Sequence, residues 1–318
     1  MPRPVAVGLI NVSMEIMPLA QRRAELLRMV AGAGKSGCQI VLLPEFADHH
    51  RTKESHAAHA KGRDEVRRIN SLRLDSPWMK EVAALAKAFN MVVIPDVMLH
   101  DGGNGRDGGR YFNSAVVFGP KGDVLGQYRK THLAPGECET FDPGDAIEPI
   151  ATPYGRIGLL ICYDINFPEL TRVHEMKGAE LLLWTTMRQA EHEEGLYRAV
   201  LPGRAWTHGI PFGVATYVSE GQLVMRNPMS SILYNCFGQV IAGGLVTPGV
   251  VRGVADLDEH PLERRTWANP EWLNSGAYLR RQRRPDLYGV LTRPLSAGER
   301  DLRNEPAVRP ASPEQMKD

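Results

Sequence analysis

Short runs of apolar residues recur along the whole chain, and segments with a helical pattern separate several of them. The apolar runs predict β-strands at residues 4–10, 38–44, 91–99, 112–119, 156–162, 179–186, 210–218, 230–235 and 250–257. Segments 17–37, 76–90 and 167–180 predict helices. Continuous apolar strands are buried on both faces, so other layers should cover the sheet. The pattern therefore predicts an α/β fold with mixed strands.

Local signals mark the ends of several elements. Ser76 followed by Pro77 predicts an N-cap and a proline at the first helical position. The sequence Pro-Lys-Gly after the run at 112–119 predicts a hairpin turn. From about residue 262 the chain becomes rich in Pro and Arg, and beyond about residue 295 it is polar. We therefore predict one domain over residues 1–262 and a C-terminal extension over 263–318 that ends in a frayed tail.

Composition narrows the class of protein. The chain has 318 residues, of which 43% are hydrophobic and 24% are charged, as is ordinary for a soluble globular protein. A net charge of +1 gives no broad attraction for nucleic acid or for an anionic membrane. The N-terminus lacks the pattern of a signal peptide, and no stretch approaches the roughly 18 apolar residues of a membrane span. We expect a cytoplasmic protein without nucleic-acid or membrane partners.

The cysteines are scattered along the chain, at Cys38, Cys138, Cys162 and Cys236. Their spacing fits neither a disulfide framework nor a zinc site, and a reducing compartment keeps such thiols free. A buried cysteine is most often a packing residue, and Cys38 and Cys236 fit that interpretation. Cys162 differs because it ends an apolar run and is followed by Tyr-Asp.

Two other predicted strands also end near reactive side chains. The run at 38–44 delivers Glu45, and Lys130 leads into a loop rich in Gly and Pro. Alone, such a glutamate is more typical of a solvated strand end, and such a lysine is more typical of the surface. In an α/β sheet, however, the loops at strand ends assemble active sites. A carboxylate, an ammonium and the Cys162 thiol at three strand ends therefore form a consistent set.

This set has the chemistry for acyl transfer from a carbon–nitrogen bond to sulfur and then to water. The thiolate is the nucleophile, and a nearby carboxylate can take the thiol proton as a general base. An ammonium stabilises the thiolate and then the oxyanion of the tetrahedral intermediate. The backbone N–H of Tyr163, directly after the cysteine, is the candidate for a second oxyanion donor.

Over residues 4–260 the sequence resembles the nitrilase superfamily, the carbon–nitrogen hydrolases. The stretches LLPEF (42–46), YRKTHL (128–133) and GLLICYDINFPEL (158–170) resemble the glutamate, lysine and cysteine motifs of that family, in the same order. One such motif is weak, whereas three in the right order with the right neighbours are specific. The order of the motifs therefore outweighs the interpretation of the cysteine as a packing residue.

The resemblance implies a role for each motif residue. Glu45 falls at the general base, Lys130 at the catalytic lysine and Cys162 at the nucleophile. The stretch GECETFDPG also resembles the segment that carries a second, supporting glutamate, and Glu137 falls there.

The resemblance also implies an α-β-β-α sandwich that pairs into a layered homodimer, with C-terminal segments that often cross to the partner. No metal or organic cofactor is expected, and the reactants are a small amide-type substrate and water. Candidates for substrate binding are Phe46, Tyr111, Tyr163, Asn166, Thr186 and Met187.

The residues after the cysteine bear on which bond is cleaved. Nitrile-cleaving relatives usually have Trp-Glu where this chain has Tyr163-Asp164, which favours an amide. Relatives that cleave N-carbamoyl amino acids commonly place an arginine three or four residues after the cysteine to hold a carboxylate. This chain has Ile165 and Asn166 there. We predict hydrolysis of a small linear amide to a carboxylic acid and ammonia.

Alternatives remain open at this point. An N-carbamoyl compound, anchored by Arg188 or Arg204 instead, is the next candidate substrate, and a nitrile follows. A binding or redox-sensing module without turnover is the alternative from another class. His56 and His59 have helical spacing, but their polar segment is more typical of a solvated loop or helix than of a metal site. Because residues 49–59 follow the glutamate motif, they are also a candidate edge of the pocket.

Overall fold

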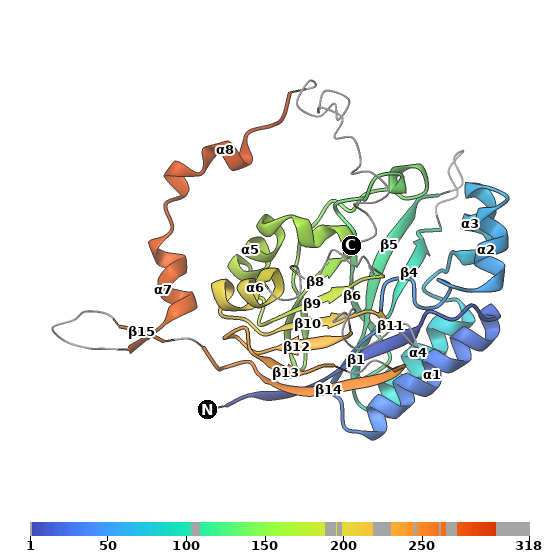
Figure 1. Cartoon of the computed structure of the whole chain (residues 1–318), viewed down its shortest axis with the longest axis horizontal. Coiled ribbons are helices and arrows are strands. Elements are labelled where there is room, and N and C mark those ends of the chain that lie inside the picture. Colours follow the sequence, from blue (N-terminus) through green and yellow to red (C-terminus); the bar gives the residue numbers. More distant parts are fainter. Residues whose placement is uncertain are drawn as a thin grey trace, which may run out of the picture. The chain divides into compact units, whose positions relative to one another are not determined.

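The computed structural model of the chain describes residues 2–102, 109–187, 195, 199–218, 230–244, 247–260, 262–264 and 272–296 (Figure 1). The chain forms two compact units, Met1–Ala277 and Tyr278–Asp318. The boundary that the composition predicts at residue 262 stays a prediction. No helix in the described ranges is long and apolar enough to cross a bilayer.

The first sheet contains eight of the described strands, in the order β11-β1-β2-β3-β5-β4, with β14 paired to β1 and β6 paired to β5. Their bounds are Pro4–Ser13 (β1), Ile40–Leu42 (β2), Val92–Ile94 (β3), Asp96–His100 (β4), Tyr111–Phe118 (β5), Val124–Arg129 (β6), Tyr217–Val218 (β11) and Gly249–Asp256 (β14). Strands β1, β2 and β3 are parallel to one another, and β5 is antiparallel to both β4 and β6. The β5–β6 pair is the predicted hairpin.

The second sheet contains six of the described strands, in the order β13-β12-β10-β9-β8-β7. Their bounds are Ile150–Thr152 (β7), Gly155–Ile161 (β8), Leu181–Thr185 (β9), Phe212–Ala215 (β10), Ile232–Tyr234 (β12) and Val240–Ala242 (β13). The central strands β8, β9 and β10 are parallel. A short separate pair joins β15 (Leu262–Arg264) to β16 (Trp272–Asn274).

Helices cover the outer face of each sheet, so the main body has the predicted α-β-β-α layers (Figure 1). Helices α1 (Leu19–Lys35) and α4 (Pro77–Ala88) pack on the first sheet, and α5 (Pro168–Met176) and α6 (Leu201–His208) pack on the second. Alternation along β1 explains the layering, because side chains at successive positions point to opposite faces. Val5, Val7 and Leu9 lie in the core between the sheets, whereas Ile10 and Val12 lie in the core under α1 and α4.

The other helices in the described ranges are short. Helices α2 (Lys53–His59) and α3 (Arg63–Asn70) follow β2, and the short 3₁₀ helices η1 and η2 span Glu137–Glu139 and Cys162–Asn166. The remaining elements are α7 (Ser275–Gln282), η5 (Pro285–Leu287) and α8 (Gly289–Thr292).

Several elements differ from the sequence pattern for physical reasons. The apolar run at 91–99 forms two strands, β3 and β4, since Pro95 between them has no N–H for a ladder. The run at 210–218 also divides, because β10 joins the second sheet and β11 pairs with β1 in the first. Ser76 does occupy the N-cap of α4, but its hydroxyl accepts the N–H of Arg73 at 2.9 Å and does not cap the helix.

Candidate active site

The three strand ends that the sequence singled out meet at one place between the sheets. Glu45 follows β2, Lys130 follows β6, and Cys162 follows β8. The Lys130 Nζ lies 3.2 Å from Oε1 of Glu45 and 2.9 Å from Oε1 of Glu137. The side chains of Glu45 and Lys130 are both 0% exposed, and Cys162 is 7% exposed. The structure therefore brings a carboxylate, an ammonium and a thiol together in a buried site.

Glu45 is held rigidly by partners from separate elements. Asn113 on β5 donates its Nδ2–H to Oε1 at 2.8 Å, and the backbone N–H of Met187 donates to Oε2 at 3.1 Å. The Tyr217 hydroxyl donates to the Glu45 backbone carbonyl at 2.8 Å. Such support fixes the position of this carboxylate and of its backbone.

Lys130 sits between two carboxylates. Glu137 reaches it from η1, where its Oε2 also accepts the Ala134 N–H at 2.6 Å. Burial alone would lower the pKa of Lys130, but the negative charges of Glu45 and Glu137 raise it above its ordinary value. Lys130 therefore stays charged wherever the enzyme is folded and working.

Cys162 occupies a strained turn at the end of β8. Its φ is 45°, a left-handed conformation that is rare for a residue with a side chain and that concentrates at functional sites. The indole N–H of Trp184 donates to the Cys162 carbonyl at 3.1 Å and helps to hold this turn.

The thiol of Cys162 is neutral at rest. Burial, and after it the negative charge of Glu45, raise the pKa of Cys162 far above its ordinary value, although Lys130 opposes them. The same carboxylate accepts a hydrogen bond from the thiol. The proton can therefore pass from sulfur to Glu45 at the moment of attack, with no free thiolate at rest.

Asp164 connects the cysteine turn to the lysine segment, a role that sequence reasoning missed. Its buried carboxylate accepts the Ile161 N–H at 3.0 Å on one side. On the other side it accepts the Tyr128 hydroxyl at 2.8 Å and the His132 N–H at 3.0 Å. An acidic residue two positions after Cys162 was visible in the sequence, but its partners were not.

We expect Asp164→Ala to destabilise the fold and to impair catalysis together. The change leaves several buried donors without an acceptor, and each such donor costs about 1–3 kcal/mol. The free energy of unfolding, measured by urea denaturation, should fall by about 3 kcal/mol or more. Asp64→Ala is the matched control, because that side chain is 94% exposed. Equal stability of the two variants would contradict the bridging role of Asp164.

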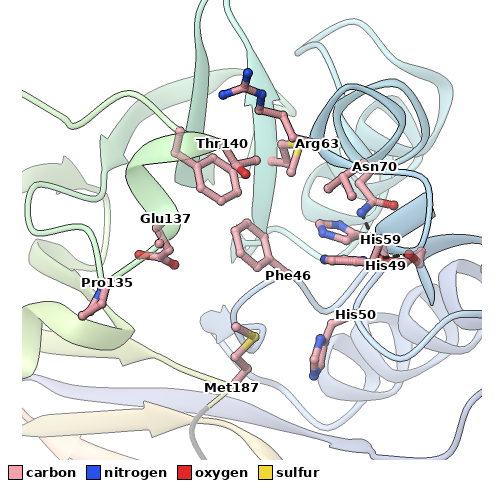
Figure 2. A pocket seen from close by; sticks show the side chains of 16 residues that line it. Phe46, His49, His50, His59, Arg63, Asn70, Pro135, Glu137, Thr140 and Met187 are labelled. Atoms are coloured by element: carbon pink, nitrogen blue, oxygen red, sulfur yellow. Dashed lines mark hydrogen bonds between the residues drawn. The ribbon is translucent and has the colours of Figure 1, made fainter. Parts of the chain in front are cut away.

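A cavity of ≈ 340 Å³ opens beside Glu137 and is walled by residues from α2, α3 and the loop around η1. Figure 2 shows Glu137 and Pro135 on one side, His49, His59 and Asn70 on the other, and the Phe46 ring between them. The size lies in the range of small-molecule sites. Glu137 lines the cavity whereas Glu45, Lys130 and Cys162 do not, so the cavity is a candidate place for the part of a substrate that extends beyond the reacting carbonyl.

Three of the histidines after Glu45, His49, His50 and His59, line this cavity. Burial, and then the nearby His49 and Arg51, lower the pKa of His50 to about 3, so that its ring is uncharged. His59 shares a hydrogen bond of 2.7 Å between Nδ1 and the Ser55 carbonyl. In the described ranges, no group of three or more His, Cys, Asp or Glu side chains is placed to hold a metal ion.

The predicted substrate-binding residues fall into two groups. Phe46 and Met187 line the cavity. The other four do not line it. Tyr111 packs under the Arg67 guanidinium, and Tyr163 packs on Phe167. Asn166 is exposed, and Thr186 is buried. These four remain predictions.

Other candidates from the sequence lie away from the cavity or outside the described residues. Ile165 is buried in the core under α5 and α6 and cannot present a side chain to substrate. Arg204 lies on α6 and does not line the cavity, and Arg188 lies outside the described residues. Cys138 is an exposed thiol in η1, next to Glu137.

Comparisons with known proteins agree with this geometry. A model of the family described as carbon–nitrogen hydrolase matches residues 6–253. An omega-amidase from Xenopus tropicalis is 30% identical over 276 residues, which are 83% of this chain and 89% of that protein. An N-carbamoylputrescine amidase from Solanum tuberosum is 29% identical over 283 residues, which are 83% of this chain and 87% of that protein.

Among solved structures, the chain resembles a variant of the amidase from Nesterenkonia sp. AN1. In that structure acrylamide has added to the active-site cysteine. The two structures share a TM-score of 0.66 at 20% identity, over 90% of this chain and 99% of the other. A likeness at this identity concerns the fold, and it confirms the predicted sandwich.

Proposed function

The chain belongs to the carbon–nitrogen hydrolase family, the nitrilase superfamily, and from that premise we propose that it hydrolyses a small amide to a carboxylic acid and ammonia. It is an enzyme that cleaves a carbon–nitrogen bond. One observation carries the finer proposal: the Lys130 ammonium and the Cys162 thiol both contact the buried carboxylate of Glu45. That arrangement supports covalent catalysis through a thioester.

In the proposed reaction, Glu45 takes the thiol proton while Cys162 Sγ attacks the amide carbonyl carbon. The carbonyl oxygen becomes an oxyanion, which the Lys130 ammonium and the backbone N–H of Tyr163 stabilise. When the carbon–nitrogen bond breaks, Glu45 returns the proton to the nitrogen, and ammonia leaves. A water molecule then gives a proton to Glu45 and attacks the thioester carbon. When the carbon–sulfur bond breaks, the acid leaves, and Glu45 returns the proton to Cys162 Sγ.

Glu137 has a supporting part in this proposal. Its carboxylate holds Lys130 from the side opposite Glu45, at 2.8 Å from Nζ, and its own position is fixed by the Ala134 N–H. Two carboxylates keep the ammonium charged and aimed at one place. Glu137 also lines the cavity, so that it bounds the space for the substrate.

We expect an amide to be a better substrate than the matching nitrile. The motivation is Tyr163-Asp164 after the nucleophile, where nitrile-cleaving relatives have Trp-Glu. The measurement is ammonia release from a short-chain primary amide and from the nitrile with the same carbon chain. Faster conversion of the nitrile to the acid would reverse this assignment.

An N-carbamoyl compound is the second candidate, and two observations favour it. The relative from Solanum tuberosum is an N-carbamoylputrescine amidase. The Arg63 side chain belongs to the cavity wall, where its guanidinium could hold the carboxylate of an N-carbamoyl amino acid. The same ammonia assay, run with N-carbamoyl compounds and with small amides, shows which of the two substrate classes is hydrolysed faster. A module without turnover is excluded once hydrolysis is detected and depends on Cys162.

We also propose that the protein works as a homodimer in the cytoplasm. The resemblance to the family motivates this, and Met176 on α5 and Trp206 on α6 are 47% and 55% exposed despite their apolar side chains. The mass in solution, measured by light scattering, distinguishes a dimer from a monomer.

A further inference from the structure

Asp96 is a buried carboxyl group beside the catalytic residues that the reaction above does not use. It is the first residue of β4 and is 1% exposed. Its Oδ1 accepts the backbone N–H of Phe46 at 3.1 Å, and its Oδ2 has no hydrogen-bond partner among the described residues. The register of β4 and β5 puts its side chain on the same face as Asn113, which holds Glu45.

The turn that Asp96 holds is the one that presents Glu45. Phe46 has a φ of 52°, a conformation that is costly for a residue with a bulky side chain. Its N–H is buried and would otherwise lack an acceptor. The Phe46 ring also lines the cavity and stacks on Phe141 at 5.5 Å (Figure 2). The hydrogen bond that the Phe46 N–H donates to Asp96 therefore fixes both Glu45 and part of the cavity wall.

The surroundings of Asp96 do not support a negative charge. The nearby cation, Lys130, is already shared by the carboxylates of Glu45 and Glu137. A single neutral N–H donor does not replace the water that an ionised carboxylate loses on burial. Burial, and after it the charge of Glu45, accordingly raise the pKa of Asp96 well above its ordinary value.

We propose that Asp96 is an uncharged positioning residue, which holds the Phe46 N–H and thereby aims Glu45 at Cys162 without placing a second negative charge beside the base. This inference rests on the proposed function of Glu45. It gives the carboxyl groups of the site separate tasks: Glu45 moves the proton, Glu137 supports Lys130, and Asp96 shapes the turn. It also parallels Asp164, whose carboxylate holds the strained turn at the nucleophile.

The first test compares two substitutions. Asp96→Asn keeps an uncharged carbonyl oxygen for the Phe46 N–H, so activity and the pH–rate profile should stay close to those of the unaltered enzyme. Asp96→Ala removes the acceptor, and a misplaced base should lower kcat by about 10²-fold with a smaller change in KM. If the acid limb of the pH–rate profile moved to lower pH in Asp96→Asn, the proposal would be overturned. Such a shift would mean that the substitution had removed a negative charge beside Glu45 and so lowered the pKa of Glu45.

The second test needs no turnover. An infrared difference spectrum between the unaltered protein and Asp96→Asn, at neutral pH, should show the C=O stretch of a protonated carboxyl group. Asp48→Asn is the matched control. Burial alone would raise the pKa of Asp48, but His49 and Arg23 hold it below its ordinary value. This control should remove only a carboxylate band. A carboxylate band in the Asp96 spectrum would overturn the proposal.

Two measurements without turnover separate failure of this inference from failure of the proposed function. If no amide is hydrolysed, the infrared spectrum still shows whether Asp96 is charged. The rate of Cys162 alkylation then shows whether Asp96 positions Glu45, because alkylation depends on Glu45 taking the thiol proton. Alkylation should slow in Asp96→Ala and not in Asp96→Asn. Equal rates in both variants, with both folded by circular dichroism, would overturn the positioning role.

Discussion

Cys162→Ala is expected to abolish amide hydrolysis. Loss of the nucleophile removes the thioester route entirely, and comparable removals in acyl-transfer enzymes cost about 10⁶-fold in kcat. The protein should remain folded, because the change deletes one sulfur atom from a site that is 7% exposed. Ammonia release measures the loss, and circular dichroism checks the fold.

The unaltered enzyme should also form an acyl adduct on this cysteine alone. Mass spectrometry of peptides, after a brief reaction with substrate and an acid quench, locates the added mass. Cys138→Ala is the matched control, since Cys138 is an exposed thiol next to Glu137 and is the most accessible competitor. An adduct on Cys138, or full activity in Cys162→Ala, would contradict the mechanism.

The other two thiols make poor alternatives for a physical reason. Both are buried, and burial raises the pKa of Cys38 and raises that of Cys236 to about 12. Cys162 shares this property, yet it alone among the four has the carboxylate of Glu45 as a proton acceptor and Lys130 beside it. Its reactivity therefore comes from its partners and not from a low pKa.

Glu45 and Cys162 could be singled out because each one follows an apolar run, and strand ends converge in an α/β fold. Lys130 follows the mostly polar β6, so the order of the three motifs was needed to group it with them. The layers follow from the same strands, since alternate residues of β1 enter two different cores. Such predictions depend on local pattern, which the chain displays directly.

Asp96 and Asp164 were not predictable in the same way. Each is an ordinary acidic residue in the sequence, and its importance arises from burial and from the N–H group that it meets. Phe46 and Cys162 are held in strained turns that no composition or periodicity reveals. Short strands such as β7 and β15 also escaped prediction, because three residues carry too little periodicity.

Lys130→Met is expected to lower turnover and to slow the reaction of Cys162 with alkylating agents. Methionine nearly matches the length of lysine but carries no charge, so the oxyanion loses its main electrostatic support. Removing one such group typically costs about 10²–10³ in kcat. The fold should also weaken, because Glu45 and Glu137 would then be left near each other without their shared cation. Thermal unfolding, with Lys121→Met at an exposed turn as control, measures that second effect.

The pH dependence of alkylation separates the electrostatic effect from a general loss of structure. Lys130 lowers the pKa of Cys162, whereas burial and Glu45 raise it. Removing the ammonium must therefore raise the thiol pKa further, so that the alkylation profile moves to higher pH and the rate at neutral pH falls. A loosened site would instead lower the pKa of Cys162, because water would reach the sulfur and relieve the effect of burial. An alkylation profile that stays in place or moves to lower pH would show that the Lys130 charge does not act on the sulfur, and the shared site at the three strand ends would have to be reconsidered.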